Sequence, residues 1–335
     1  MLNRLWTLAT RPDGEPNTGN FELKTIELTR DPDAGQILVR NRFLSLDPYM
    51  RWRMNDAKSY AKPVGLGEVM VGATVGEVIR SNHADFAPGD IVLGGGGWQD
   101  LAVLDGKAAR KIDDCLPPST ALGILGSPGF TAYAGLMKIG SPKPGETVLV
   151  GAATGPVGSM VGQLAKLSGC RAVAIVGGPE KAALAIERFG FDAAVDHGDR
   201  NVAAALADAC PDGVDVYFEN IGGKIFELVL PLLNDFARVP VCGLVSQYNA
   251  GDGGPSNIPL AVAMQHVLVK RLTLRGFIIT DFSNFLDEFL KMATPLVASG
   301  KLVYLEDMVD NLENAPAAFI GLLKGQNIGK VIVRL

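Results

Sequence analysis

The chain has 335 residues, of which 47% are hydrophobic and 20% charged, so it carries enough apolar material for two globular domains. Its formal net charge of −5 argues against nucleic acid or an anionic membrane as a partner. No apolar run is long enough for a transmembrane span or a signal peptide, and we therefore expect a cytoplasmic protein.

Residues 1–120 are rich in turns and in short β patterns. Partial apolar–polar alternation predicts strands over residues 35–46, 72–79 and 90–93, and the Pro88-Gly89-Asp90 turn precedes the third of them. The glycine tract at 94–97 is not followed by a helical pattern, which favours a loop over a phosphate cradle. This half predicts a mainly antiparallel barrel or sandwich.

The hydrophobic period changes after residue 120. A helix is expected over 121–136, and strands are then expected over 147–151, 171–176, 193–195, 214–219, 236–243 and 272–279. Helices are expected between them over 159–168, 179–189, 202–210, 224–233 and 260–270, with a last one over 281–299. This alternation predicts a doubly wound, six-stranded parallel sheet in an α/β domain. A final strand at 330–334 returns the tail to the first domain, which gives domains of 1–120 plus 300–335 and of 121–299.

The turn after the first of these strands is the strongest functional signal. Gly151, Gly155 and Gly158 allow close backbone approach where a helix begins, and free N–H groups there suit a pyrophosphate. The spacing is looser than the usual Gly-x-Gly-x-x-Gly. By itself it does not separate a nucleotide site from a plain strand-to-helix turn, but the alternation that follows favours the nucleotide.

The next two strand ends bear on the choice of cofactor. The strand at 171–176 ends without the acidic residue that binds a ribose 2′-hydroxyl, and Lys181 follows in the first turn of a helix. A cation there favours NADP over NAD, whereas a solvated surface lysine is the alternative. His197 follows the next strand and is expected either to contact an adenine or to be a loop residue without a ligand.

The later strand ends carry polar groups for the reacting part of a cofactor. Asn220 can bond a ribose or nicotinamide, or else cap a helix. Tyr248 begins a Gly/Pro/Asn-rich segment to Pro259, expected to be a mobile loop, and its hydroxyl can donate to a developing enolate oxygen. Residues 276–279 suit a nicotinamide face or core packing equally well.

Metal chemistry is not expected. The four cysteines are far apart in sequence, and neither they nor the three histidines show the ligand spacing of a zinc site; they are Cys115, Cys170, Cys210, Cys242, His83, His197 and His266. In the first half, residues 46–54 combine aromatic, sulfur and basic side chains after a strand. They predict either the wall of an apolar substrate pocket, with Tyr49 as a second hydroxyl, or aromatic packing between domains.

The chain resembles the zinc-free branch of the medium-chain dehydrogenase/reductase superfamily, which includes prostaglandin reductases, plant alkenal double-bond reductases and bacterial curcumin reductase, and is most similar to the curcumin-reductase-like members. The resemblance covers nearly the whole length. The matching segments are 44–51 (LSLDPYMR), 126–133 (GSPGFTAY), 152–158 (AATGPVG), 217–223 (YFENIGG), 241–243 (VCG), 246–249 (SQYN), 276–278 (GFI) and 325–330 (GQNIGK).

This resemblance implies a GroES-like β-barrel joined to a Rossmann domain, a homodimer, and NADPH-dependent reduction of the C=C bond of small apolar α,β-unsaturated ketones and aldehydes. It implies that Tyr248 is catalytic, that Tyr49 binds substrate and that Lys181 binds the 2′-phosphate. The remaining cofactor-binding residues that it implies are Gly155, Pro156, Val157, Gly158, Asn220, Cys242, Gly243, Ser246, Phe277, Ile278, Ile279 and Asn327.

Two positions differ from the family pattern, both near the expected 2′-phosphate. His197 stands where many members have a tyrosine, and Gly178 replaces the usual serine or threonine. Two other activities stay open at this point: quinone reduction on the same scaffold, and NADPH binding without turnover.

Overall fold

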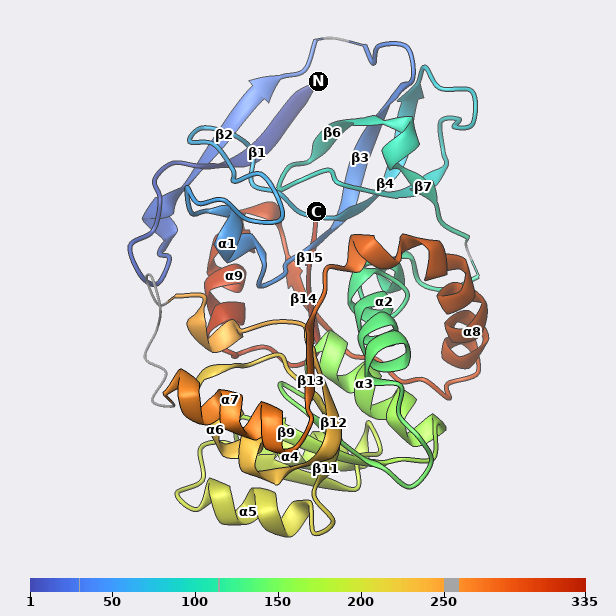
Figure 1. Cartoon of the computed structure of the whole chain (residues 1–335). Coiled ribbons are helices and arrows are strands. Elements are labelled where there is room, and N and C mark those ends of the chain that lie inside the picture. Colours follow the sequence, from blue (N-terminus) through green and yellow to red (C-terminus); the bar gives the residue numbers. More distant parts are fainter. Residues whose placement is uncertain (30, 114, 250–258) are drawn as a thin grey trace. The chain divides into compact units, whose positions relative to one another are not determined.

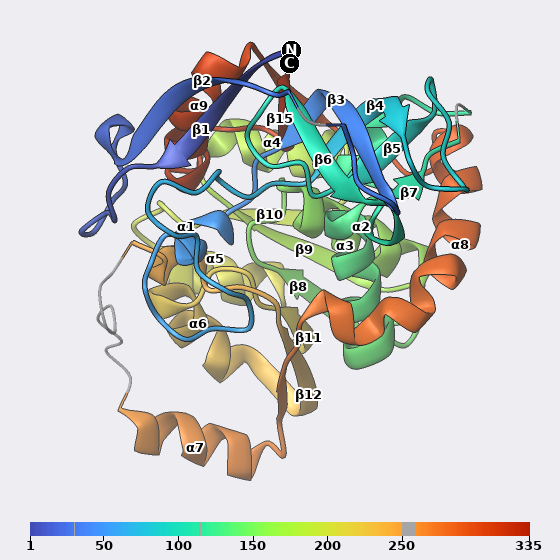
Figure 2. The same cartoon turned by 90° about the horizontal axis from the view of Figure 1, so that it is seen from above.

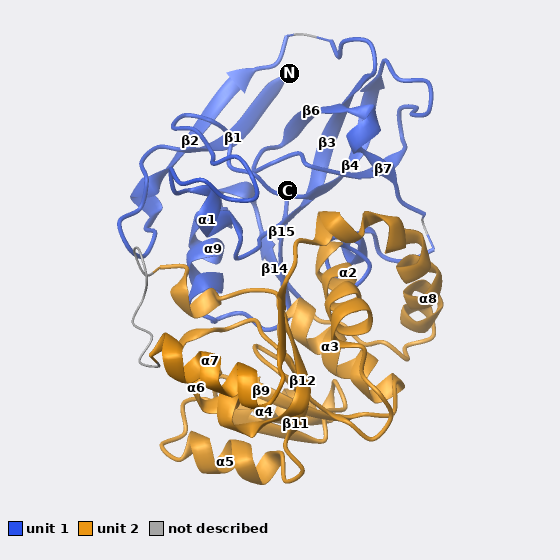
Figure 3. Cartoon of the chain, viewed as in Figure 1, with its two compact units in different colours: residues 1–126, 306–335 blue, residues 127–305 orange. Residues whose placement is uncertain are grey.

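The computed structural model describes residues 1–29, 31–113, 115–249 and 259–335 of the chain. Residues 1–126 and 306–335 form one compact unit (unit 1), and residues 127–305 form another (unit 2) (Figure 3). Both boundaries lie six residues beyond the positions that we expected, at 126 instead of 120 and at 306 instead of 300. The tail therefore belongs to the same unit as the N-terminal segment.

Unit 1 is built mainly from antiparallel strands (Figure 1). One ladder joins β1 (Leu2–Leu8) to β2 (Phe21–Glu27), and the larger sheet has the order β14-β15-β3-β4-β5-β7, with β6 also paired to β3. Its strands are β3 (Gln36–Ser45), β4 (Thr74–Ser81), β5 (Ile91–Gly94), β6 (Leu101–Asp105), β7 (Arg110–Lys111), β14 (Glu306–Asp310) and β15 (Lys330–Arg334). The three strands predicted in this half are β3, β4 and β5, and the arrangement is that of a GroES-like domain.

Two helices help to close the main core of unit 1. They are α1 (Met50–Arg53) and α9 (Ala315–Leu323). The Trp98 ring is fully buried and stacks on Phe21 at 5.5 Å, while Phe319 of α9 meets it edge-on at 5.6 Å. Met50 joins this cluster from α1, so the segment that contains Tyr49 rests on a packed aromatic core.

Unit 2 contains the predicted six-stranded parallel sheet, in the order β10-β9-β8-β11-β12-β13. Its strands are β8 (Thr147–Val150), β9 (Arg171–Val176), β10 (Ala193–Asp196), β11 (Val214–Phe218), β12 (Leu233–Val241) and β13 (Thr273–Gly276). Strands β8 and β9 are buried almost throughout, as expected for parallel strands that are covered on both faces. The order reverses between β8 and β11, and ligands bind at such switch points in this kind of sheet.

Helices cover both faces of this sheet. Its helices are α2 (Ser127–Tyr133), α3 (Pro156–Leu167), α4 (Pro179–Glu187), α5 (Val202–Ala209), α6 (Gly223–Val229), α7 (Leu260–Val269) and α8 (Leu286–Ala298). Side chains of α5, α6 and α7 pack on one core together with Leu149, Val173 and Val239. Since β8–α3–β9 and β9–α4–β10 run the other way along the sheet, right-handed crossovers place α3 and α4 on the opposite face. Unit 2 is a Rossmann domain.

The predicted start of the helix over 121–136 is wrong. Residues 118–122 form a short 3₁₀ helix instead, and α2 begins at Ser127. A Cβ on Gly126 would lie 2.1 Å from the Ala121 carbonyl oxygen, so the chain turns sharply here. Pro128 lies in the first turn of α2, where the missing N–H costs nothing, so it marks a helix start and not an interruption. Residues 134–140 continue as a π-helix.

Two other segments depart from prediction. The predicted helix 224–233 ends at Val229 in a 3₁₀ turn that contains Pro231, because proline cannot continue the hydrogen-bond ladder. The strand predicted to reach residue 279 ends at Gly276, and residues 279–285 form a 3₁₀ helix before α8. The loop predicted between Tyr248 and Pro259 falls mainly on 250–258, which are outside the described residues.

Candidate functional site

The first strand end at the switch point is a close-packed turn. Gly155 is the N-cap of α3, in extended conformation, and Pro156 opens the helix. A Cβ on Gly158 would lie 2.4 Å from the Ala152 carbonyl oxygen, so only glycine lets the helix approach the strand this closely. The first N–H groups of a helix have no partner within it, and no acidic residue stands in the first turn of α3. This helix end is suited to an anion.

The strand end of β9 has an unusual backbone. Gly178 precedes α4 with a φ of 90° and a ψ of 158°, a conformation that side-chain-bearing residues rarely adopt. The family's usual serine or threonine would therefore be strained here. Lys181 lies in the first turn of α4, and partial burial lowers the pKa of its ammonium group. His197 is exposed, yet its Nε2 would lie 3.1 Å from a Cβ on Gly177, so its ring borders the same turn.

A carboxylate that the sequence analysis did not single out holds this turn. One oxygen of Asp196, at the end of β10, accepts the N–H groups of Gly178 at 2.8 Å and Gly198 at 2.9 Å. These bonds hold the pKa of the Asp196 carboxyl below its usual range. An aspartate two residues before a glycine is a common turn signal, and that signal was available in the sequence.

Asn220 joins two strand ends of the sheet. Its amide nitrogen donates to the Gly151 carbonyl oxygen at 2.8 Å, across the switch point from β11 to β8. The N-cap of α6 is Gly222, whose N–H is bonded by Glu219, and the Asn220 side chain bonds Gly151 instead, so the helix-capping alternative for Asn220 is wrong. Asn220 thereby fixes the carboxyl end of β11 beside the glycine turn.

The end of β12 holds the candidate catalytic tyrosine. A Cβ on Gly243 would lie 3.2 Å from the Tyr248 hydroxyl oxygen, so that oxygen lies directly over the backbone of Gly243. Ser246 fixes the intervening 3₁₀ turn, because its N–H and its hydroxyl both donate to the Ile221 carbonyl oxygen, at 3.0 and 2.6 Å. Burial raises the pKa of the Cys242 thiol to about 12, so this side chain is a neutral wall and not a nucleophile.

Beneath these residues is a buried carboxyl that the sequence analysis also passed over. Glu219 is 1% exposed, and its Oε1 accepts the N–H groups of Ile221 at 2.6 Å and Gly222 at 2.8 Å and the hydroxyl of Tyr217 at 3.1 Å. Its other oxygen has no partner among the described residues. Burial raises the pKa of Glu219, against the opposing effect of these hydrogen bonds.

Phe277 packs against other aromatic side chains, as the core-packing alternative predicted. Its ring meets Phe218 at 6.5 Å and Phe282 at 5.9 Å, both edge-on, and closes over Gly135 of the π-helix. Ile278 and Ile279 are half-buried beyond the end of β13.

The two remaining predicted residues belong to unit 1. Tyr49 is the residue before α1, and burial raises the pKa of its phenol, which keeps it a hydrogen-bond donor. The loop before it is held from β15, where the buried Lys330 ammonium donates to the Leu46 carbonyl at 2.5 Å and to Asp47 at 2.7 Å. Asn327 turns its amide onto the Gly329 carbonyl at 2.8 Å.

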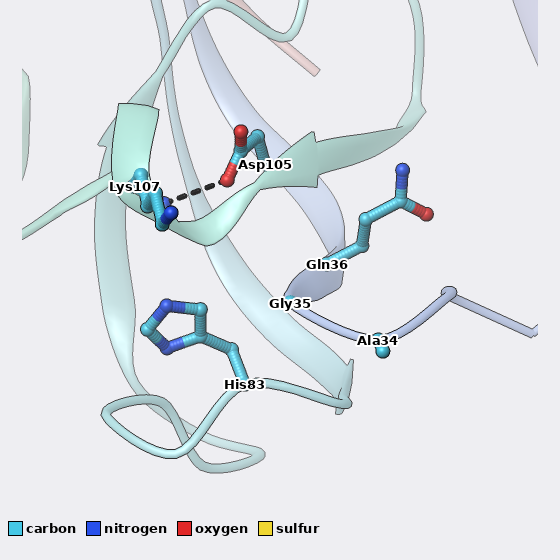
Figure 4. A pocket seen from close by; sticks show the side chains of 6 residues that line it. All are labelled: Ala34, Gly35, Gln36, His83, Asp105 and Lys107. Atoms are coloured by element: carbon cyan, nitrogen blue, oxygen red, sulfur yellow. Dashed lines mark hydrogen bonds between the residues drawn. The ribbon is translucent and has the colours of Figure 1, made fainter.

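A pocket of about 300 Å³ also lies in unit 1, and none of its lining residues is a predicted site residue (Figure 4). Its lining residues come from the loops that flank β3, β4 and β6: Ala34, Gly35, Gln36, His83, Asp105 and Lys107. Asp105 accepts the backbone N–H of Lys107 at 2.9 Å and so closes a local turn. Within residues 1–29, 31–113, 115–249 and 259–335, no group of three or more His, Cys, Asp or Glu could hold a metal ion, and no helix is long and apolar enough to cross a membrane.

Comparison with known proteins places this geometry in a family. A profile described as "N-terminal domain of oxidoreductase" matches residues 4–112, and one described as "Zinc-binding dehydrogenase" matches residues 156–294. The NADPH-dependent curcumin reductase of Escherichia coli (strain K12) is 52% identical over 99% of this chain and 97% of its own. The chain belongs to the zinc-free medium-chain dehydrogenase/reductase family.

Other members of this family agree along the full length. The 2-alkenal reductase (NADP(+)-dependent) of Nicotiana tabacum is 40% identical over 96% of this chain and 94% of its own. CurA from Vibrio vulnificus, solved in complex with NADPH, has a TM-score of 0.95 and 50% identity, with 99% of this chain and 98% of that chain covered. The family resemblance and the fold class predicted from the sequence are thus confirmed.

The residues of unit 2 fit the cofactor of such a reductase. A turn with Gly151 and Gly155 at its ends precedes a helix N-terminus free of acidic residues, where a pyrophosphate would lie. Lys181 stands at the start of the next helix along, as a cation for a 2′-phosphate. Asn220 and Gly243 form the other end of the same edge, under the Tyr248 hydroxyl.

Proposed function

We propose that this protein is an NADPH-dependent reductase of the C=C bond in α,β-unsaturated ketones and aldehydes. The observation that carries the proposal is the position of the Tyr248 hydroxyl over Gly243, at the sheet edge that also carries the glycine turn. Family membership supports the assignment as an NADP-dependent oxidoreductase, and the names of the curcumin and alkenal reductases support a C=C bond as the target.

Tyr248 has the catalytic role in this proposal. When bound, NADPH supplies a hydride for the β-carbon of the substrate. Negative charge then grows on the substrate's carbonyl oxygen, and the Tyr248 hydroxyl donates a hydrogen bond to it. A preorganised donor of this kind lowers a barrier by about 2.7–4 kcal/mol. Water or a proton relay completes the reaction at the α-carbon.

The other predicted residues bind and orient. Gly155, Pro156, Val157 and Gly158 receive the pyrophosphate at the start of α3. Lys181 and His197 border the 2′-phosphate. Asn220, Cys242, Gly243, Ser246, Ile278, Ile279 and Asn327 line the rest of the cofactor, with Phe277 supporting them from the aromatic cluster. Tyr49 forms a wall of the substrate pocket.

We also propose a homodimer, with a second copy on the β13 edge of unit 2. Strand β13 ends the sheet, and all four of its residues are exposed. The neighbouring α7 lies at the margin of the unit and has no buried residue; Leu260 and Leu268 are 76% and 77% exposed (Figure 2). An open edge beside apolar side chains is normally covered in a native protein. Light scattering should give twice the mass of one chain.

The reaction class is tested by loss of NADPH absorbance with methyl vinyl ketone and cinnamaldehyde, beside benzoquinone and with NADH as the alternative donor. We expect turnover to the saturated carbonyl product, with NADPH favoured. Activity with benzoquinone alone would move the assignment to quinone reduction. NADPH binding without turnover on any acceptor would leave a binding protein.

A further inference from the structure

The 2′-phosphate end of the site contains a carboxylate that a phosphate site would not be expected to keep. Asp196 lies at the end of β10, and its Oδ1 accepts the Gly178 N–H at 2.8 Å. Gly178 is the N-cap of α4, and Lys181 follows in the first turn of that helix. The negative charge is therefore bonded to the very turn at which Lys181 would receive the phosphate.

This charge has no salt-bridge partner. Asp196 forms no salt bridge within the part of the chain that the structure describes; two main-chain N–H groups hold its oxygen, and the adjacent His197 adds a smaller electrostatic contribution. Those bonds favour the ionised form, which places a full negative charge at this turn at neutral pH.

The same contact removes a donor. Backbone N–H groups at a helix start commonly bind phosphate, but the Gly178 N–H is already used by Asp196. A side-chain hydroxyl at position 178 is excluded in turn by the φ of 90°. Lys181 and the exposed His197 are left as the groups that favour the phosphate.

We propose that Asp196 is a cofactor-specificity residue, which restrains the preference of this protein for NADPH over NADH. Its carboxylate repels the 2′-phosphate and withholds the Gly178 N–H from it, whereas a ribose hydroxyl carries no charge to repel. The inference rests on the proposed NADPH-dependent function.

The test is fluorescence titration of the purified full chain with NADPH and with NADH. Asp196→Asn keeps an oxygen for the Gly178 N–H and removes the charge. We expect it to tighten NADPH binding about three- to tenfold, as for a like charge within a Debye length, and to change the Kd for NADH less than twofold. High salt should shrink the gain.

The matched control is Asp199→Asn, because Asp199 also bonds a backbone N–H, that of Asn201 at 2.8 Å, in the same loop. It should change NADPH binding less than Asp196→Asn does, because Asp199 makes no bond to the Gly178 turn. Equal changes for the two cofactors in Asp196→Asn, or unchanged NADPH binding, would overturn the inference. Failure of the unaltered protein to bind NADPH would instead refute the proposed function, so the two failures are distinct.

Discussion

Asp196 and Glu219 lie at the carboxyl ends of two strands of the same sheet. Both accept hydrogen bonds from backbone N–H groups, but their pKa values shift in opposite directions. Each carboxyl follows or ends a parallel strand, and one oxygen of each accepts two backbone N–H groups of a glycine-containing turn. The pKa of Asp196 is lowered by these bonds, whereas burial raises the pKa of Glu219 in spite of them.

The difference teaches that solvent exposure can outweigh hydrogen bonding in setting the direction of the pKa shift of such a group. Asp196 keeps contact with water, and its ionised form costs little. Glu219 is 1% exposed and has an oxygen without a partner, so its ionised form is penalised. Ionisation is therefore favoured at Asp196 and opposed by burial at Glu219.

The largest effect should come from Glu219→Ala. This substitution leaves the N–H groups of Ile221 and Gly222 and the Tyr217 hydroxyl without their hydrogen-bond acceptor. We therefore expect the free energy of unfolding to fall by about 3 kcal/mol or more. Because Ile221 also holds Ser246, the turn that carries Tyr248 should loosen, with a lower kcat in the folded fraction. Urea unfolding and active-site-normalised rates measure this. Glu187→Ala, at an exposed site on α4, is the control, and equal losses in both variants would contradict the role of Glu219.

Tyr248→Phe tests the proposed catalytic hydroxyl beside the Glu219 turn. Losing the donor to the carbonyl oxygen should lower kcat by more than tenfold, within the roughly 2.7–4 kcal/mol that such donors supply, with little change in NADPH affinity. Steady-state kinetics with an enone and fluorescence titration of NADPH separate the two effects. An unchanged kcat would remove Tyr248 from the mechanism.

Lys181→Ala tests the proposed 2′-phosphate contact near Asp196. Loss of one charge-assisted contact to the 2′-phosphate should weaken NADPH binding about tenfold and leave NADH binding nearly unchanged. The Kd values of the two cofactors are the measurement. Equal weakening of both would show that Lys181 supports the fold of α4 and not the phosphate.

The smallest effect should be seen in Glu219→Gln. A carboxyl whose pKa is raised on folding favours the folded state fully only below the ordinary glutamate pKa of about 4.3, and this contribution is lost as the pH rises through the raised value. The glutamine amide of the variant does not ionise, so the variant does not lose this contribution as the pH rises. The Tm of the variant relative to the unaltered protein should therefore rise from acid to neutral pH, by calorimetry, and a flat difference would mean that Glu219 titrates normally.

Much of unit 2 could be read from its sequence, because strand and helix leave different periods in the apolar residues. The six strands and the glycine turn follow from that pattern alone. The start of α2 was missed because the helix was predicted to run from residue 121 through Pro128, whereas in the structure Pro128 lies in the first turn. The strand predicted to 279 ends at Gly276, and the ring of Phe277 packs beside Phe218, which is distant in sequence and meets it only in the fold.

The sequence by itself determined the fold class, the glycine turn and the polar residues that follow each strand, since these depend on local propensity and period. Only the tertiary structure decided which of those residues meet. Asp196 reaches Gly178 because β10 lies beside β9, and Asn220 reaches Gly151 because β11 lies beside β8. Burial in the folded core is also what raises the pKa of Glu219, because the cost of a charge depends on the water that folding removes.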